Sequence, residues 1–206
     1  MKLRSILVAF ALLLGASATA SAQEEPKLKL LSPFGESIQV GGGVTNFLAD
    51  ATRDATNVGG YWDVRATFGT RSYLGGEAAY LGAAQNVRAL GLDNSAYLTQ
   101  NGIEGALRVN LPIEKGRFLM EPFVLGGVGW AHYNIQNASF NTSSMKGSDD
   151  VLTLPVGCGF AFGFEHLIID GRFTYRPAFN DELMTAGNSA AGLQNWSAGA
   201  MVGYEY

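Results

Sequence analysis

The stretch that decides the fold runs from Gly60 to Arg71 and reads GYWDVRATFGTR. Apolar and polar side chains alternate along it, which is the two-residue period of an extended strand. One face would carry Trp62, Val64, Ala66 and Phe68, and the other Asp63, Arg65, Thr67 and Gly69. The first face suits an apolar environment, whereas the second needs polar partners.

Similar alternation recurs from Glu36 to Tyr206 and predicts eight strands. The expected strands are 36–47, 60–71, 74–85, 97–111, 118–135, 151–164, 167–178 and 195–206. Short connections at 72–73, 112–117 and 165–166 alternate with long ones at 48–59, 86–96, 136–150 and 179–194. In an antiparallel meander this puts every long loop at one end, as in bacterial outer-membrane barrels. The prediction is an all-β fold, an eight-stranded antiparallel up-and-down transmembrane β-barrel.

The amino end has the pattern of a secretory signal peptide. Lys2 and Arg4 precede an apolar run at 6–14, and Ala20-Ser21-Ala22 has the small-x-small form that signal peptidase cuts. That run is too short to favour a retained membrane helix. The expected parts of the chain are a signal peptide at 1–22, cleaved before Gln23, a flexible periplasmic lead-in at 23–35, and the outer-membrane barrel at 36–206.

Net charge and cysteine content exclude some partners and chemistry. Because Lys2 and Arg4 leave with the leader, the formal net charge falls from −4 to −6. No basic patch remains to neutralise phosphates, so nucleic acid is not an expected partner. Cys158 is the only cysteine, so it forms no intramolecular disulfide. It is two residues from both Val156 and Phe160, so it has their parity, which means that it lies on the same face of the strand. We interpret it as a small apolar filler rather than a reactive thiol.

Alternation alone does not separate a membrane barrel from a soluble lipocalin-type barrel, which turns its apolar face inward. The four Lys that follow the leader, at 27, 29, 115 and 146, all lie outside the expected strands. A water-washed exterior would normally include lysine, whereas Arg paired with carboxylate suits a confined lumen. The expected lumen charge network is Asp63, Arg65, Glu77, Glu104, Arg108, Glu121, Asp170, Arg172 and Arg176. Its charges nearly cancel, which favours a plugged interior over an ion-selective pore.

Aromatic residues on the apolar face gather toward the strand ends. Near the long loops are Trp62, Tyr97, Trp130 and Trp196, and near the short turns are Phe118, Phe164, Tyr204 and Tyr206. Trp and Tyr favour the two membrane interfaces, so the pattern predicts two aromatic belts. A soluble core gives no reason for two belts.

The last expected strand, from Asn195 to Tyr206, ends on an aromatic residue and should close the barrel against 37–47. In this strand and in its architecture the chain resembles the bacterial outer-membrane barrels of the OmpA and OmpX kind. The resemblance implies insertion by the barrel-assembly machinery after periplasmic transit. Unlike full-length OmpA, the chain is not expected to carry a globular peptidoglycan-binding domain after the last strand, so a cell-wall tether is not expected.

His132 is the candidate for catalytic chemistry. Some eight-stranded outer-membrane barrels are lipid A deacylases with a lipid-facing His and Ser. His132 shares the parity of Trp130, but the next side chain on that face is Asn134, and the His-x-Ser spacing is missing. We therefore interpret His132 as an interfacial polar residue.

Two acidic pairs, Asp149-Asp150 and Asp181-Glu182, could together hold calcium, but without ordered ligand spacing they are better interpreted as solvated loop charge. No zinc, haem or nucleophile motif is present, and no cofactor is expected.

The sequence thus predicts a non-enzymatic outer-membrane protein of a Gram-negative bacterium, with a role in envelope integrity or in surface contact through its loops. Expected partners are outer-membrane lipids, the assembly machinery and a surface ligand. The long strand at 118–135 could form a rim outside the bilayer that docks a partner by strand addition. The alternatives are a small passive channel and a lipid A-modifying enzyme.

Overall fold

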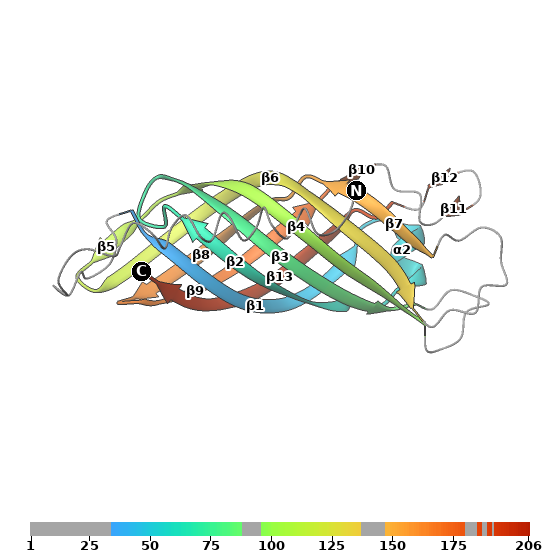
Figure 1. Ribbon diagram of the computed structural model, residues 1–206, viewed down its shortest axis with the longest axis horizontal. Coiled ribbons are helices and arrows are strands. Elements are labelled where there is room, and N and C mark those ends of the chain that lie inside the picture. Colours follow the sequence, from blue (N-terminus) through green and yellow to red (C-terminus); the bar gives the residue numbers. More distant parts are fainter. Residues whose placement is uncertain (1–33, 88–95, 137–146, 180–184, 187–188, 191) are drawn as a thin grey trace, which may run out of the picture. The chain divides into compact units, whose positions relative to one another are not determined.

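The structure, a computed structural model, describes residues 34–87, 96–136, 147–179, 185–186, 189–190 and 192–206. These residues form a closed antiparallel barrel of eight strands, which confirms the predicted fold (Figure 1). The wall consists of β1 (Glu36–Phe47), β2 (Gly59–Phe68), β3 (Leu74–Asn86), β4 (Tyr97–Asn110), β6 (Phe118–Gln136), β8 (Val156–Phe164), β9 (Leu167–Arg176) and β13 (Asn195–Glu205).

Smaller elements extend the wall or lie in its connections. They are α2 (Asp50–Ala55), β5 (Ile113–Lys115), β7 (Ser148–Thr153), β10 (Ala178–Phe179), β11 (Thr185–Ala186) and β12 (Ser189–Ala190). Among the described helices, none is long and apolar enough to cross a membrane. The helix α2 was not expected, because its residues were assigned to a loop.

The barrel closes where β1 pairs with β13, from Ser37 opposite Glu205 to Phe47 opposite Asn195. Hydrogen-bonded partners can be followed once around the wall, and the path returns to β1 ten residues beyond its start. It runs through Glu36, Phe68, Gly76, Leu107, Gly126, Val156, Tyr175, Trp196 and Asn46. This stagger sets the strand tilt that an eight-stranded barrel needs to close.

Two expected strands are interrupted by proline. The strand at 151–164 appears as β7 and β8, separated at Pro155, and the strand at 167–178 as β9 and β10, separated at Pro177. Proline has no N–H to donate to the ladder. Pairing nevertheless continues with the same register, because the Gly127 N–H donates to the Pro155 carbonyl at 2.9 Å and the Leu154 N–H to the Pro177 carbonyl at 3.1 Å. The sequence analysis therefore missed the interruptions at Pro155 and Pro177, but the path of the wall is as predicted.

The strand expected at 60–71 is also too long. It ends at Phe68, because Gly69 adopts φ +77 and begins the turn into β3. Gly69 supplies this left-handed conformation without the steric cost of a Cβ atom. Arg71 consequently lies in the turn rather than in the wall.

The two faces of the wall differ in polarity as the alternation predicts. Val40, Leu107 and Val128 point outward and are 52%, 67% and 60% exposed. Gln39 and Arg108, one residue away from Val40 and Leu107, point inward and are fully buried. A surface with many exposed large apolar residues is unfavourable in water and favourable in a bilayer.

Cys158 belongs to the outward face. It is exposed, so it does not fill a core, although its parity is the expected one.

Candidate functional site

The barrel interior gathers all nine charged residues that the sequence assigns to it. Eight of them are at most 6% exposed. Glu104 has a side chain that is 7% exposed. They come from β2, β3, β4, β6 and β9, and they point inward because the strands alternate.

Glu77 of β3 is at the centre of this network. Its carboxylate contacts three guanidinium groups: Arg65 at hydrogen-bond distance, Arg172 at 3.2 Å and Arg108 at 3.6 Å. Arg65 also donates to Asp63 at 2.6 Å. One carboxylate therefore links β2, β4 and β9 across the interior, and charge-assisted hydrogen bonds of this kind are the strong ones.

Arg108 carries the network toward the short turns. Its Nη2 donates to Glu121 at 2.7 Å, and its guanidinium carbon lies 3.8 Å from the centroid of the Phe123 ring. Arg172 donates from Nε to Asp170 at 2.9 Å. Glu121 of β6 and Asp170 of β9 are thus joined to the central cluster. The Phe123 ring adds a cation–π contact with Arg108.

A separate pair lies nearer the long loops. Arg176 of β9 donates to Glu104 of β4 at 3.2 Å and to the Ser197 hydroxyl of β13 at 2.6 Å. Next to it, the Asn195 amide donates to the Tyr133 hydroxyl at 2.9 Å. All the predicted charges therefore have an ionic partner inside the barrel.

Sequence reasoning missed a second ionic group at the short-turn mouth. Glu205 of β13 is fully buried and accepts from Arg71 at 3.0 Å and from the Thr70 hydroxyl at 2.5 Å. Arg71 also reaches Glu114 at 3.2 Å. The signal for Glu205 was present, because it alternates with outward Tyr204 and Tyr206. Arg71 was hidden because it belongs to a turn, where parity has no meaning.

The loop end of the interior is lined by an apolar cluster, whereas the expected lumen network consists only of charged residues. The cluster consists of Phe47, Val87, Ala96, Leu98, Ala131, Tyr133, Ile135, Val151 and Leu193. Phe47 ends β1 and is 6.2 Å from the Tyr133 ring, measured between ring centroids. Alternating positions of β6 supply Ala131, Tyr133 and Ile135, and β4 supplies Leu98. A second, smaller cluster contains Phe123, Leu125, Ala161 and Ile168.

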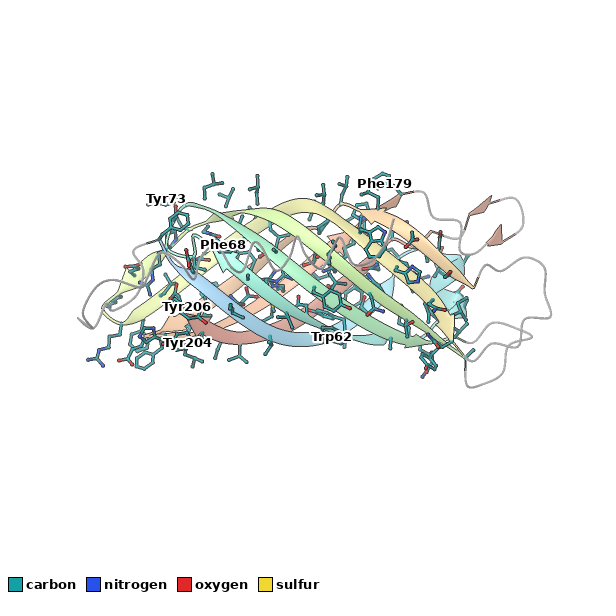
Figure 2. All side chains as sticks on the ribbon, viewed as in Figure 1. Trp62, Phe68, Tyr73, Phe179, Tyr204 and Tyr206 are labelled. Atoms are coloured by element: carbon teal, nitrogen blue, oxygen red, sulfur yellow. The ribbon has the colours of Figure 1, made fainter. Side chains whose placement is uncertain are left out.

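The eight predicted belt aromatics all lie on the outward face. Trp62, Trp130, Phe118, Phe164, Tyr204 and Tyr206 are exposed, and Tyr97 and Trp196 are intermediate. Figure 2 shows Phe68, Tyr73, Tyr204 and Tyr206 toward the end that carries the short turns, and Trp62 and Phe179 farther toward the long loops. Tyr73, Phe68 and Phe179 were not assigned to a belt in the sequence analysis.

His132 lies on the outward face near the long loops. Its Nδ1 is 2.8 Å from the Asp150 carboxylate, and its ring stacks on Trp130 at 6.3 Å between centroids. Asp150 therefore pairs with His132, which was not foreseen, because that contact depends on the register between β6 and β7.

The remaining acidic candidates do not form a described metal site. Asp149 precedes Asp150 in β7 and accepts from the Asp150 N–H at 3.0 Å, whereas Asp181 and Glu182 lie outside the described residues. Within the part of the chain that the structure describes, no group of three or more His, Cys, Asp or Glu is placed to hold a metal ion.

Solved structures show where this architecture occurs. Ail, the attachment invasion locus protein of Yersinia pestis, is 13% identical, with a TM-score of 0.51, over 84% of this chain and 98% of Ail. Ail in complex with the heparin analogue sucrose octasulfate is 12% identical over the same shares, with a TM-score of 0.55. Neisserial surface protein A is 9% identical, with a TM-score of 0.50, over 85% of this chain and 98% of its own. At these identities the similarity concerns the fold alone.

Sequence comparison gives the family. A search of the curated proteins found no match. The family model described as the outer membrane protein beta-barrel domain matches residues 8–206, which is nearly the whole chain. This protein therefore belongs to the outer membrane protein beta-barrel domain family.

Proposed function

We propose that the protein is a non-enzymatic barrel with a closed lumen, which supports the envelope and contacts external partners through its long loops. The observation that carries this proposal is that the interior contains both the ion pairs around Glu77 and, nearer the long loops, an apolar cluster that includes Phe47 and Leu98. A barrel of eight strands is just wide enough to be filled by side chains.

The interior gives two separate obstacles to a passing solute. An ion would have to displace the guanidinium groups that neutralise Glu77, and leaving a buried charge unpaired is costly. It would then have to cross the apolar cluster, which offers an ion few replacements for its water. Both obstacles argue against the alternative of a small passive channel.

The long connections have a composition suited to contact and a charge that restricts the partner. The ranges 48–59, 86–96, 136–150 and 179–194 contain seven acidic and three basic residues. Ail was solved with a sulfated heparin analogue, but a polyanion would be repelled by these loops. We propose a neutral or basic surface ligand instead.

An enzymatic role has only partial geometric support. The His132–Asp150 pair resembles the base and its orienting carboxylate in a hydrolase. Within the described residues, His132 contacts Asp150 and Trp130, and neither supplies the hydroxyl or thiol nucleophile that such a base would activate. The proposal therefore assigns His132 no catalytic role.

The route to the membrane is also part of the proposal. Residues 1–22 would be removed as a signal peptide before Gln23, and 23–35 would remain as a periplasmic lead-in. The assembly machinery would then insert the barrel, whose last strand ends near Tyr206. Orientation with the long loops outside follows the organisation of known outer-membrane barrels.

The ionic centre can be tested by Glu77→Gln. The change leaves Arg65, Arg108 and Arg172 with one carboxylate fewer, and we expect a loss of about 3–5 kcal/mol in the free energy of unfolding. Urea unfolding in detergent micelles measures it. The matched control is Glu114→Gln, because Glu114 is half-exposed and also contacts an arginine. We expect less than about 1 kcal/mol there, and equal losses in both variants would contradict a central role for Glu77.

The closed lumen can be tested by planar-bilayer recording of the purified barrel. We expect no steady conductance, since the apolar cluster and the ion pairs occupy the interior. Replacement of Phe47 and Leu98 by Gly in one variant removes two members of that cluster and should leave the recording silent, because the ionic layer remains. Steady single-channel steps from the unaltered protein would instead support the passive channel.

The contact role can be tested by replacing residues 137–146 with a short Gly-Ser linker. The flanking strands β6 and β7 pair with each other independently of this segment, so insertion and heat-modifiable gel mobility should be retained. We expect bacteria that carry the shortened protein to bind less to neutral or basic glycan and protein surfaces than bacteria with the full-length protein. A linker of equal length in the short connection at 112–117 provides the control. Unchanged binding across such a panel would argue against contact through this loop.

A further inference from the structure

The outward surface of the wall changes from apolar to polar within one row of paired residues. The register between β3, β4, β6 and β7 places Tyr80, Ile103, Trp130 and Leu152 side by side. The next row toward the loops is Gly82, Asn101, His132 and Asp150, and the row after it is Ala84, Thr99, Asn134 and Ser148. We call the first of these the apolar row, and we call Asn101, His132, Asp150, Thr99, Asn134 and Ser148 the polar grid.

The apolar row has the properties of the boundary between acyl chains and head groups. All four of its side chains are exposed. Tyr80 is 5.5 Å from Trp62, measured between ring centroids, and Trp62 packs over Gly82 at the edge of the grid. Tyr and Trp prefer this depth because the ring contacts hydrocarbon while its polar atom stays hydrated. The polar grid therefore begins where lipid head groups lie.

The polar grid combines neutral hydrogen-bonding groups with one oriented acid. Asp150 is held by His132 at 2.8 Å, and both are substantially exposed, with side chains 63% and 37% accessible. Asn101 and Asn134 each offer an acceptor and two donors beside them. The grid contains no Lys or Arg, the residues that bind phosphate most readily. This chemistry suits a neutral ligand rich in hydroxyl groups.

We propose that the polar grid binds the sugar head group of a glycolipid whose acyl chains lie against the apolar row. The polar grid adjoins the lipid-facing surface of the barrel. A ligand anchored in the membrane by its acyl chains would therefore lie beside the grid. Such tethering raises the effective concentration of the sugar at the grid. Asp150 accepts hydrogen bonds from hydroxyl groups of the sugar, and His132 and Asn101 form hydrogen bonds with the adjacent hydroxyl groups. The edge of the Trp130 side chain contacts the sugar ring. This inference rests on the proposed membrane placement of the wall.

The test uses Trp130 as a local reporter. The chain has three tryptophans, so Trp62→Phe and Trp196→Phe leave Trp130 as the only one. Three phosphatidylcholine vesicle samples are compared, and each contains the same minor fraction of one lipid with brominated acyl chains. The brominated lipid is monogalactosyl diacylglycerol in the first sample, phosphatidylglycerol in the second and phosphatidylcholine in the third. Bromine quenches Trp fluorescence at short range, so quenching reports which lipid lies against the apolar row.

We expect the galactolipid to associate with the Trp130 site about threefold more tightly than phosphatidylcholine, the gain of roughly one net hydrogen bond. His132→Ala, Asp150→Asn and Asn101→Ala should each reduce the preference toward parity. The control Asp54→Asn removes an exposed carboxylate at the same end but outside the grid, and it should keep the preference. Heat-modifiable gel mobility verifies folding, and three independent variants keep the test decisive if one fails to fold.

Three results would overturn the proposal: equal quenching by all three lipids, stronger quenching by brominated phosphatidylglycerol, or a galactolipid preference that survives every grid variant. Conductance and cell binding are separate measurements, so a negative result here would leave the proposed function standing. Conversely, loss of surface contact would not alter the lipid preference of Trp130.

Discussion

A backbone surrounded by hydrocarbon has no water to bond, so each N–H and C=O must find a partner within the protein. The pairing of β1 with β13 helps to meet this requirement, because it closes the sheet of wall strands on itself. The stagger of ten residues around the barrel then fixes the tilt and the width of the interior. Everything placed inside must fit that width, and everything outside must tolerate lipid.

The side chains that fill the interior form layers along the barrel. Arginines and carboxylates around Glu77 occupy the middle, Arg71 and Glu205 lie at the short-turn mouth, and an apolar cluster occupies the loop end. Buried ion pairs of this kind add little net stability, but each one prevents a far more costly unpaired charge. Their consequence is specificity, because a strand that slipped by one residue would turn its charges toward lipid.

Parity was sufficient to predict which residues face inward, since it depends only on neighbours along one strand. It was insufficient to predict partners. Glu77 meets arginines from β2, β4 and β9 because of the stagger between distant strands, which no local pattern encodes. The His132–Asp150 pair depends likewise on the register of β6 with β7. Arg71 was not predicted as an ionic partner because Gly69 ends β2 early and places Arg71 in a turn. The apolar cluster was not predicted because inward residues near the loops are apolar, unlike the charged inward residues farther along the strands.

The central claim is that the apolar rows face lipid and the ionised rows face one another inside. Single cysteines placed from Tyr61 to Phe68, in a background with Cys158→Ala, test it most directly in vesicles. A bilayer-confined thiol probe should label positions 64 and 66, and the thiols at 63 and 65 should resist it. Labelling of 64 and 66 by a water-soluble reagent, with no reaction toward the bilayer probe, would contradict the account.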